Sequence, residues 1–319
     1  MSRSLVLSGL AALLLGSAAA GAQELSEIRI DWATYNPVSV LLKDEGLLEE
    51  EFAEDGISIT WVQSAGSNKA LEFLNASSID FGSTAGSAAF LARVNGNPVH
   101  SIYVYSKPEW TALVTGEGSD IDEVADLKGR TVAVTRGTDP HIFLVRALAD
   151  AGLSERDLNL VLLQRADGRT ALQRGDVDAW AGLDPLMAAA EIEDGARLFF
   201  RDPSANTWGV LNTREDFAEE HPEIVERVLA VYEEARQRAL ADPAALKALL
   251  VEATGLPDEV ISRQIERTDL THSRIGDEQA ATILAAGEAL QAAGVVPAEL
   301  DVAATVDELI DTRFGGVGQ

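Results

Sequence analysis

The chain has 319 residues and is strongly acidic, with 52 aspartates and glutamates against 25 lysines and arginines. Such a surface is a poor partner for nucleic acid, and the absence of cysteine excludes disulfides, thiolate metal sites and cysteine nucleophiles. The length suffices for two lobes with separate cores. The acidic residues are scattered along predicted helices, which is typical of a solvated exterior, with cation binding as the alternative.

The N-terminal segment 1–22 has the pattern of a secretory signal. Arg3 precedes an apolar run, and the small residues Ala20-Gly21-Ala22 form a cleavage pattern. No cysteine follows this point, so we expect no lipid anchor. No later run approaches the roughly 20 apolar residues of a membrane helix. We therefore expect a soluble, exported mature protein.

Strand and helix patterns alternate over the first third of the mature chain. Strands with alternating apolar residues are predicted at 27–35, 56–64, 77–83 and 99–106, and helices at 36–52, 65–76 and 87–94. Such alternation predicts parallel sheets covered by helices. The segment 23–112 is therefore interpreted as the first part of lobe I.

A second alternating block follows and predicts a separate lobe. After a short helix that ends at 127–129, strands are predicted at 131–134, 158–164, 177–183 and 196–200, and helices at 141–153, 168–177 and 184–192. The chain then returns through a strand at 207–214 and ends in helices at 222–241, 243–254, 257–267 and 277–293. We interpret 113–206 as an inserted lobe II and 207–319 as the return to lobe I. Two crossings between the lobes would form a hinge.

Small polar residues recur where a predicted strand meets a predicted helix. The four turns are TYNP at 34–37, SAGSN at 64–68, GSTAGS at 82–87 and RGTDPH at 136–141. Helix capping explains any one of them. Ligands of open α/β sheets bind beyond the carboxyl ends of the strands, where helix N-terminal amides favour anions. Four such turns at one edge therefore predict an anion site between the lobes.

Other residues near this edge are weaker candidates. Asp184 precedes Pro185 and fits a helix N-cap, but its carboxylate is also suited to accept a hydrogen bond from a ligand. Core packing is the ordinary role of a strand tryptophan, and walling a ligand is the alternative. Trp32, Tyr35 and Trp208 are candidates for such a wall, and His141, at the start of a predicted helix, is a candidate for a ligand contact.

Three stretches carry a resemblance to a known family. They are ALEFLNASSIDFGSTAGSAAFLA, VADLKGRTVAVTRGTDPHIFLVRALADAGL and ALQRGDVDAWAGLDPL. These resemble the substrate-binding proteins of aliphatic sulfonate ABC transporters, a group related to taurine, nitrate and thiamine-precursor binding proteins. The similarity covers essentially the whole mature chain.

The resemblance implies a type II periplasmic binding protein fold, in which two three-layer α/β lobes are joined by a two-crossing hinge. It also implies a monomeric periplasmic protein in sulfur metabolism, without enzymatic activity, cofactor or metal, which delivers its organosulfonate ligand to a membrane permease with a cytoplasmic ATPase. Backbone amides and hydroxyls at the turns would hold the ligand. The implied positions are Asn36, Ser64, Ser83, Thr84, Ala85, Gly137, Thr138, Asp139 and His141.

The sequence departs from the family pattern at two turns. Thr138-Asp139-Pro140 stands where relatives often have a run of serines, and Leu183-Asp184-Pro185 stands where they often have Trp-Asp-Pro. The same fold with another small solute, such as taurine, a nitrate-like anion, or a pyrimidine or thiamine precursor, is therefore the alternative. Related enzymes, including a desulfinase, use cysteines that this chain lacks.

Overall fold

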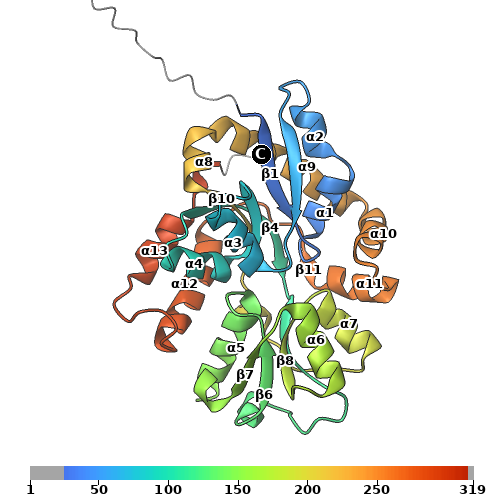
Figure 1. Ribbon diagram of the computed structural model, residues 1–319, viewed down its shortest axis with the longest axis vertical. Coiled ribbons are helices and arrows are strands. Elements are labelled where there is room, and N and C mark those ends of the chain that lie inside the picture. Colours follow the sequence, from blue (N-terminus) through green and yellow to red (C-terminus); the bar gives the residue numbers. More distant parts are fainter. Residues whose placement is uncertain (1–24, 315–319) are drawn as a thin grey trace, which may run out of the picture.

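The computed structural model describes residues 25–314, so the predicted signal segment lies outside the described residues. Two lobes of unequal size lie one above the other along the long axis (Figure 1). Lobe I is the upper one and contains both ends of the described chain, and lobe II is the lower one. None of the described helices is both long enough and apolar enough to cross a membrane.

The sheet of lobe I has six strands within the described residues, in the order β11-β4-β10-β3-β1-β2. In β1 the buried Ile28 and Ile30 alternate with more exposed residues, β2 is at most partly buried, and β3 and most of β4 are buried. The strands are β1 (Glu27–Trp32), β2 (Ser58–Gln63), β3 (Phe81–Ala85), β4 (Val99–Pro108), β10 (Gly209–Arg214) and β11 (Thr268–Asp269).

The sheet of lobe II has five strands in the described chain, in the order β7-β6-β8-β5-β9. They are β5 (Thr111–Thr115), β6 (Thr131–Val134), β7 (Asn159–Leu162), β8 (Ala179–Leu183) and β9 (Arg197–Phe200).

The prediction of parallel sheets is wrong for three strands, of which the short β11 is antiparallel to β4. Strand β10 is antiparallel to β3 and β4, and β5 is antiparallel to β8 and β9. Both follow a crossing, so each begins at the boundary between the lobes, where the parallel strands end. The directions of β10 and β5 are therefore a consequence of the hinge, and the carboxyl ends of the parallel strands still face the other lobe.

The helices of lobe I largely follow the predicted pattern, with one break. The predicted helix 36–52 is two helices, because Gly46 adopts a left-handed conformation (φ 64°) that ends the first of them. The lobe I helices are α1 (Pro37–Asp44), α2 (Leu47–Phe52), α3 (Ser67–Asn75), α4 (Gly86–Val94), α8 (Glu215–Glu220), α9 (Pro222–Ala241), α10 (Pro243–Thr254), α11 (Asp258–Glu266), α12 (Asp277–Ala292) and α13 (Val302–Leu309).

Lobe II has three α-helices among the described residues, α5 (Asp139–Asp150), α6 (Arg165–Arg174) and α7 (Leu186–Glu193). The chain crosses from β4 to β5 through Glu109 and Trp110, and returns from β9 to β10 through residues 201–208. The expected boundary at residue 113 thus falls inside β5. Helix α11 lies beside α7 and α12 beside α5, so lobe I holds lobe II on two sides (Figure 1).

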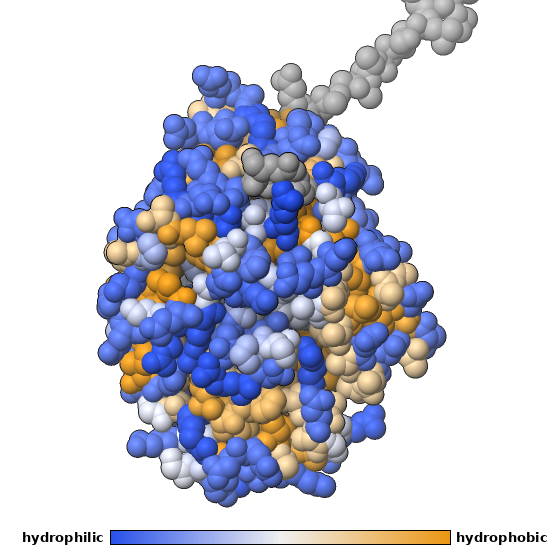
Figure 2. Space-filling view, turned by 180° about the vertical axis from the view of Figure 1, so that it is seen from behind, coloured by the Kyte–Doolittle hydropathy of each residue, from blue (hydrophilic) through white to orange (hydrophobic). Residues whose placement is uncertain are grey.

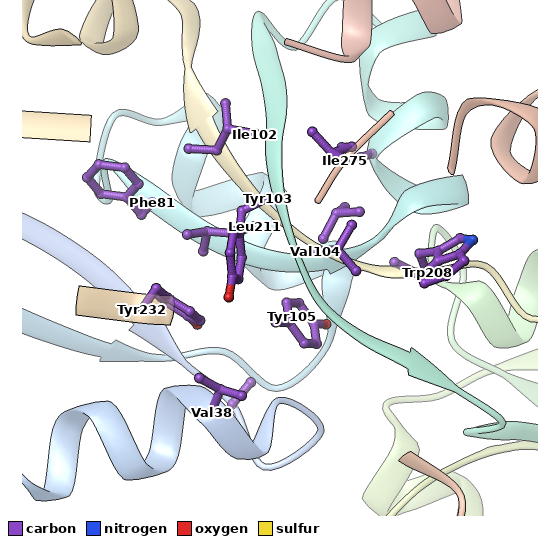
Figure 3. Packing of buried hydrophobic residues seen from close by; sticks show 14 of the residues in the cluster. Val38, Phe81, Ile102, Tyr103, Val104, Tyr105, Trp208, Leu211, Tyr232 and Ile275 are labelled. Atoms are coloured by element: carbon purple, nitrogen blue, oxygen red, sulfur yellow. The ribbon is translucent and has the colours of Figure 1, made fainter. Parts of the chain in front are cut away.

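The largest hydrophobic core lies in lobe I. Tyr103, Val104 and Tyr105 of β4 pack with Leu211 of β10 and with residues of α1 and α9 (Figure 3). Hydrophilic residues cover much of the face seen in Figure 2, with apolar patches between them. Among the described residues, Leu162 and Leu240 are the large apolar side chains that stand exposed. The acidic composition therefore belongs to the surface, around well-filled interiors.

Candidate functional site

The two lobes meet along a boundary that we call the interlobe seam. Its lobe I side is formed by the β1–α1 turn, the starts of α3 and α4, and the end of α11. Its lobe II side is formed by the starts of α5, α6 and α7. A Cβ atom added at Gly137 would lie 3.9 Å from the Cβ of Asn68. The turns predicted from the sequence therefore do meet across the lobes.

The first turn is tied firmly into lobe I. Asn36 caps α1 by accepting a hydrogen bond from the Ser39 amide at 3.3 Å. Its Nδ2 donates to Ser83 Oγ at 2.8 Å and to the Tyr232 hydroxyl at 2.7 Å, and the Tyr35 hydroxyl donates to the Ser83 carbonyl at 2.8 Å. The polar groups of Asn36 thus stabilise the turn, and we assign it a supporting role.

The third predicted turn is part of a strand. Ser83, Thr84 and Ala85 belong to β3 and pair with β10, because the returning strand supplies partners that the sequence pattern does not show. The Ser83 amide donates to Asp31 Oδ1 at 2.8 Å, and the Ala85 amide donates to Ser67 Oγ at 3.0 Å. Both amides therefore have partners within lobe I, contrary to the expectation that they are free for an anion.

A buried carboxyl group lies beneath this strand. Asp31 is inaccessible to solvent, and its Oδ1 also accepts a hydrogen bond from the Ser83 hydroxyl at 2.9 Å. Burial raises the pKa of Asp31 to about 7, against the opposing effect of the nearby Ser64 hydroxyl and of the hydroxyl and amide of Ser83. Asp31 Oδ2 has no hydrogen-bond partner. Near neutral pH this group can therefore carry or release a proton.

The second turn leaves polar atoms without partners. Ser64 is inaccessible to solvent and its hydroxyl has no hydrogen-bond partner, and Asn68 Oδ1 at the start of α3 also lacks one. Buried polar atoms in proteins are nearly always paired, and those that are not mark functional positions or sites of bound molecules. This turn is therefore the predicted lobe I turn whose side chains remain available to a ligand.

The fourth turn begins α5 on the lobe II side. Gly137 has φ 75°, and Thr138 follows as the N-cap, with its hydroxyl donating to the Thr135 carbonyl at 2.6 Å. A Cβ added at Gly66 in the second turn would lie 3.9 Å from Thr138 Cγ2. The second and fourth turns thus face each other directly, as the sequence pattern predicts.

Asp139, in the same turn, binds the hinge. Its Oδ1 accepts hydrogen bonds from Ser87 Oγ at 2.5 Å and Thr207 Oγ1 at 2.7 Å. Its Oδ2 accepts from Trp110 Nε1 at 2.8 Å and from the Thr207 amide at 3.2 Å. Trp110 and Thr207 lie on the two crossings. Both oxygens of the carboxylate are occupied, so we assign Asp139 a positioning role.

His141 is directed into lobe II. It is buried, and its Nε2 lies 3.0 Å from Glu155 Oε1, which belongs to the same lobe. This contact lowers the pKa of the Glu155 carboxyl. The contact that the structure shows for His141 therefore lies within lobe II.

Asp184 is both a helix cap and part of the seam. Its Oδ1 accepts from the Ala188 amide at 2.9 Å and lies 3.5 Å from Arg267 Nη1 in lobe I. Burial raises the pKa of Asp184 to about 7, with the charge of Arg267 opposing the rise. Asp184 Oδ2 is buried and has no partner. Asp184 can thus cap α7 with one oxygen and offer the other oxygen as an acceptor at the seam.

The tryptophans that were considered as ligand contacts pack against other side chains. Trp32 is partly buried with Lys43 over its ring at 5.4 Å. Trp208 is buried between His272, at 5.0 Å from ring to ring, and Lys107. At the seam, the Tyr35 ring instead packs edge-on against Trp110 at 6.0 Å.

Arg165 is the main seam residue that the sequence pattern did not identify. It begins α6 in lobe II, and its Nη2 donates to Thr34 Oγ1 in lobe I at 3.0 Å. Its guanidinium lies over the Tyr35 ring at 5.3 Å. Nη1 is buried without a partner, and no carboxylate of residues 25–314 forms an ion pair with Arg165. The strand-to-helix rule would have found it, had the helix been predicted from 165 instead of 168.

The partial burial of this cation is energetically unfavourable without an anion. Burial lowers the pKa of the Arg165 guanidinium, whose charge is otherwise supported by contact with the Tyr35 ring. A charged group taken from water needs an opposite charge and hydrogen bonds to offset the loss of hydration. The seam thus offers two unpaired donors to an anionic ligand, Arg165 Nη1 and the Ser64 hydroxyl.

Comparison with known proteins identifies the family. The description "NMT1/THI5 like" matches residues 52–246. An aliphatic sulfonates-binding protein of Escherichia coli (strain K12) is 33% identical over 305 residues, which are 94% of this chain and 95% of that protein.

Two solved structures share the fold. The alkanesulfonate-binding protein SsuA from Xanthomonas axonopodis pv. citri, bound to MOPS, has a TM-score of 0.81 and 28% identity over 89% of this chain and 99% of that one. The periplasmic aliphatic sulphonate binding protein SsuA from Escherichia coli has a TM-score of 0.76 and 31% identity over 90% of this chain and 92% of that one. The predicted two-lobed α/β fold is confirmed. The chain belongs to the NMT1/THI5-like family, within which it is similar to aliphatic sulfonate-binding proteins.

Proposed function

We propose that this protein is the extracytoplasmic solute-binding component of an ABC importer and captures a small aliphatic sulfonate at the interlobe seam. It acts in the periplasm as a monomer without enzymatic activity, and it hands the ligand to the permease and its ATPase. The names of its relatives support the ligand class, and one observation in this chain carries the proposal. That observation is the partly buried Arg165, which reaches across the seam without a carboxylate partner and whose Nη1 is buried and unpaired.

The chemistry of Arg165 fits a sulfonate. A guanidinium presents several N–H donors in a fixed plane, and it forms paired hydrogen bonds with oxyanions. Nη2 bonds Thr34 Oγ1, and Nη1 is a buried, unpaired donor that a ligand oxygen can occupy. An anion seated there lies where the two lobes meet, since Arg165 of lobe II bonds Thr34 of lobe I. Closure of the lobes around the anion then strengthens each contact by excluding water.

The proposed ligand-contacting groups are fewer than the sequence suggested. They are the Ser64 hydroxyl, the start of α3 at Asn68, the turn at Gly137 and Thr138, and Arg165. A second set holds the site in shape through bonds within the protein, namely Asn36, Ser83, Thr84, Ala85 and Asp139.

Isothermal titration of the mature protein with short-chain alkanesulfonates tests the proposal. We expect saturable binding of at least one sulfonate, and weaker binding of the matched carboxylates. Arg165→Gln should abolish this binding, whereas Arg156→Gln, which removes an exposed arginine of lobe II, should leave it unchanged. A ligand that binds the native state should also raise the melting temperature. Failure of every sulfonate to bind would refute the proposed function.

A further inference from the structure

We infer that the bound sulfonate carries a hydrogen-bond donor on its short tail, an amine or a hydroxyl, and that Gln264 is the residue that recognises it. The inference rests on the proposed function, because it places the sulfonate group at Arg165. Gln264 lies on α11, and its side chain is buried with 1% of its surface exposed. It belongs to the returning part of the chain, outside the turns predicted from the sequence.

The orientation of the Gln264 amide follows from its partner. Nε2 lies 2.7 Å from the carbonyl oxygen of Thr34, which can only accept a hydrogen bond. The nitrogen must therefore face Thr34, and Oε1 faces the other way. Oε1 is buried and has no hydrogen-bond partner. Gln264 thus offers a fixed, unsatisfied acceptor.

Gln264 and Arg165 meet at the same residue from opposite lobes. Gln264 bonds the Thr34 carbonyl, and Arg165 bonds the Thr34 hydroxyl at 3.0 Å. Each has one further polar atom without a partner, an acceptor oxygen on Gln264 and a donor nitrogen on Arg165. Both side chains are anchored on one residue, so we place the two ends of a short ligand at these two free atoms. Such a ligand must accept a hydrogen bond at one end and donate one at the other.

An ionised sulfonate group alone cannot satisfy both atoms. Its three oxygens accept hydrogen bonds from Arg165, but it carries no hydrogen to donate to Gln264 Oε1. A plain alkyl tail would also leave that buried oxygen unpaired. Sites built to hydrogen-bond a polar group discriminate strongly against analogues that lack it, because the protein partner stays unsatisfied.

Other buried acceptor oxygens at the seam also support a donor on the ligand. Asp184 Oδ2 is buried without a partner, and Arg267, three residues after Gln264, links this carboxylate to α11. The carbonyl oxygens of Gln164 and Asn68 also lack partners. The seam therefore has more unsatisfied acceptors than an anionic head can use, and a donor on the ligand is the group they require.

The test uses three sulfonates of nearly equal size, propane-1-sulfonate, 2-hydroxyethanesulfonate and 2-aminoethanesulfonate. We expect isothermal titration to give an affinity for the amine or the hydroxyl compound at least about tenfold higher than for propane-1-sulfonate. Gln264→Met should remove this difference and leave the affinity for propane-1-sulfonate unchanged or higher. Gln173→Met, on the surface of lobe II, is the matched control and should preserve the difference.

The outcomes separate the two proposals. Equal affinity of the native protein for all three compounds would overturn the inference about the donor while leaving the proposed function intact. If none of the three compounds binds and no longer alkanesulfonate binds either, the proposed function itself is refuted. Should Gln264→Met fail to fold, the comparison of ligands on the native protein decides the question alone.

Discussion

Asp139 at the start of α5 accepts a hydrogen bond from Ser87 at the start of α4, at 2.5 Å across the two lobes. The same carboxylate also accepts from Trp110 on one crossing and from Thr207 on the other. A single side chain in the fourth turn thus connects the ligand-facing edge of lobe II to both hinge segments and to lobe I. We interpret this as a device that couples the position of α5 to the closed arrangement of the lobes.

Replacement of Asp139 by asparagine should weaken closure. Asparagine has one acceptor oxygen, and its amide nitrogen would face the N–H donors of Trp110 or Thr207. Hydrogen bonds to a charged acceptor are worth more than neutral ones, so we expect ligand affinity to fall about tenfold or more. Small-angle X-ray scattering should show a larger radius of gyration for the variant at subsaturating ligand. Equal radii and equal affinities would show that Asp139 does not couple to closure.

The buried carboxyl of Asp31 should make stability depend on pH. The folded state holds its proton up to about pH 7, whereas the unfolded chain releases it near the ordinary pKa of 3.8. The folded state therefore binds more protons between these values, and the stabilising contribution is lost as the pH rises through about 7.

Asp31→Asn removes this titration while an amide oxygen can still accept from Ser83. We expect the unfolding free energy of the variant, relative to that of the native protein, to rise by about 2 kcal/mol when the pH is raised from 5 to 7. Urea unfolding of the variant and of the native protein at pH 5 and at pH 7 measures this difference. Asp184 is present in both proteins, so its own titration cancels. Asp176→Asn, at an exposed carboxylate, should change nothing. A constant difference across this range would contradict the assignment.

Gly209 should not tolerate a side chain. It begins β10 directly after the crossing, and an added Cβ would overlap the Tyr105 ring and the Ser106 hydroxyl. Overpacking of a filled core typically costs about 1–3 kcal/mol. We therefore expect Gly209→Ala to lower the melting temperature by several degrees. Gly116→Ala, where nothing lies near the added atom, is the control, and equal melting temperatures for the two variants would refute the expected clash.

Local signals in the sequence predicted much of the fold. Helices α9 and α10 begin and end as predicted, because Pro222 and Pro243 fix the backbone at the first helical position. The alternation of strands and helices gave two lobes, but it did not reveal the antiparallel β10, whose direction depends on where the chain crosses. Ser83, which the sequence presented as free, belongs to the strand that pairs with β10, and its amide is bonded to Asp31.

The candidate site was harder to predict for the same reason. Ser64 and Thr138 follow from the rule that polar residues end strands and begin helices. Gln264 lies on a helix without any local signal, and its role arises because the returning chain brings α11 against the Thr34 carbonyl. A contact 230 residues apart in sequence depends on tertiary packing, which periodicity alone does not encode.

A second link between the lobes lies on the opposite side from Asp139. Glu191 on α7 of lobe II accepts hydrogen bonds from Arg263 at 2.8 Å and from Arg267 at 2.6 Å, both in lobe I. Arg267 also lies 3.5 Å from Asp184. Arg267 is buried and Glu191 partly buried, so solvent and salt screen this cluster less than an exposed pair.

Glu191→Gln should therefore speed ligand release. The variant keeps the size of the side chain but removes the charge that holds two arginines, so the closed state loses more than the open one. We expect the dissociation rate to rise about fivefold or more with little change in the association rate, since interface changes act mainly on dissociation. Stopped-flow measurement with a bound sulfonate resolves the two rates. Glu193→Gln on the same helix is the control, because Glu193 pairs with Arg169 inside lobe II. Equal dissociation rates for the two variants would show that this cluster does not hold the lobes together.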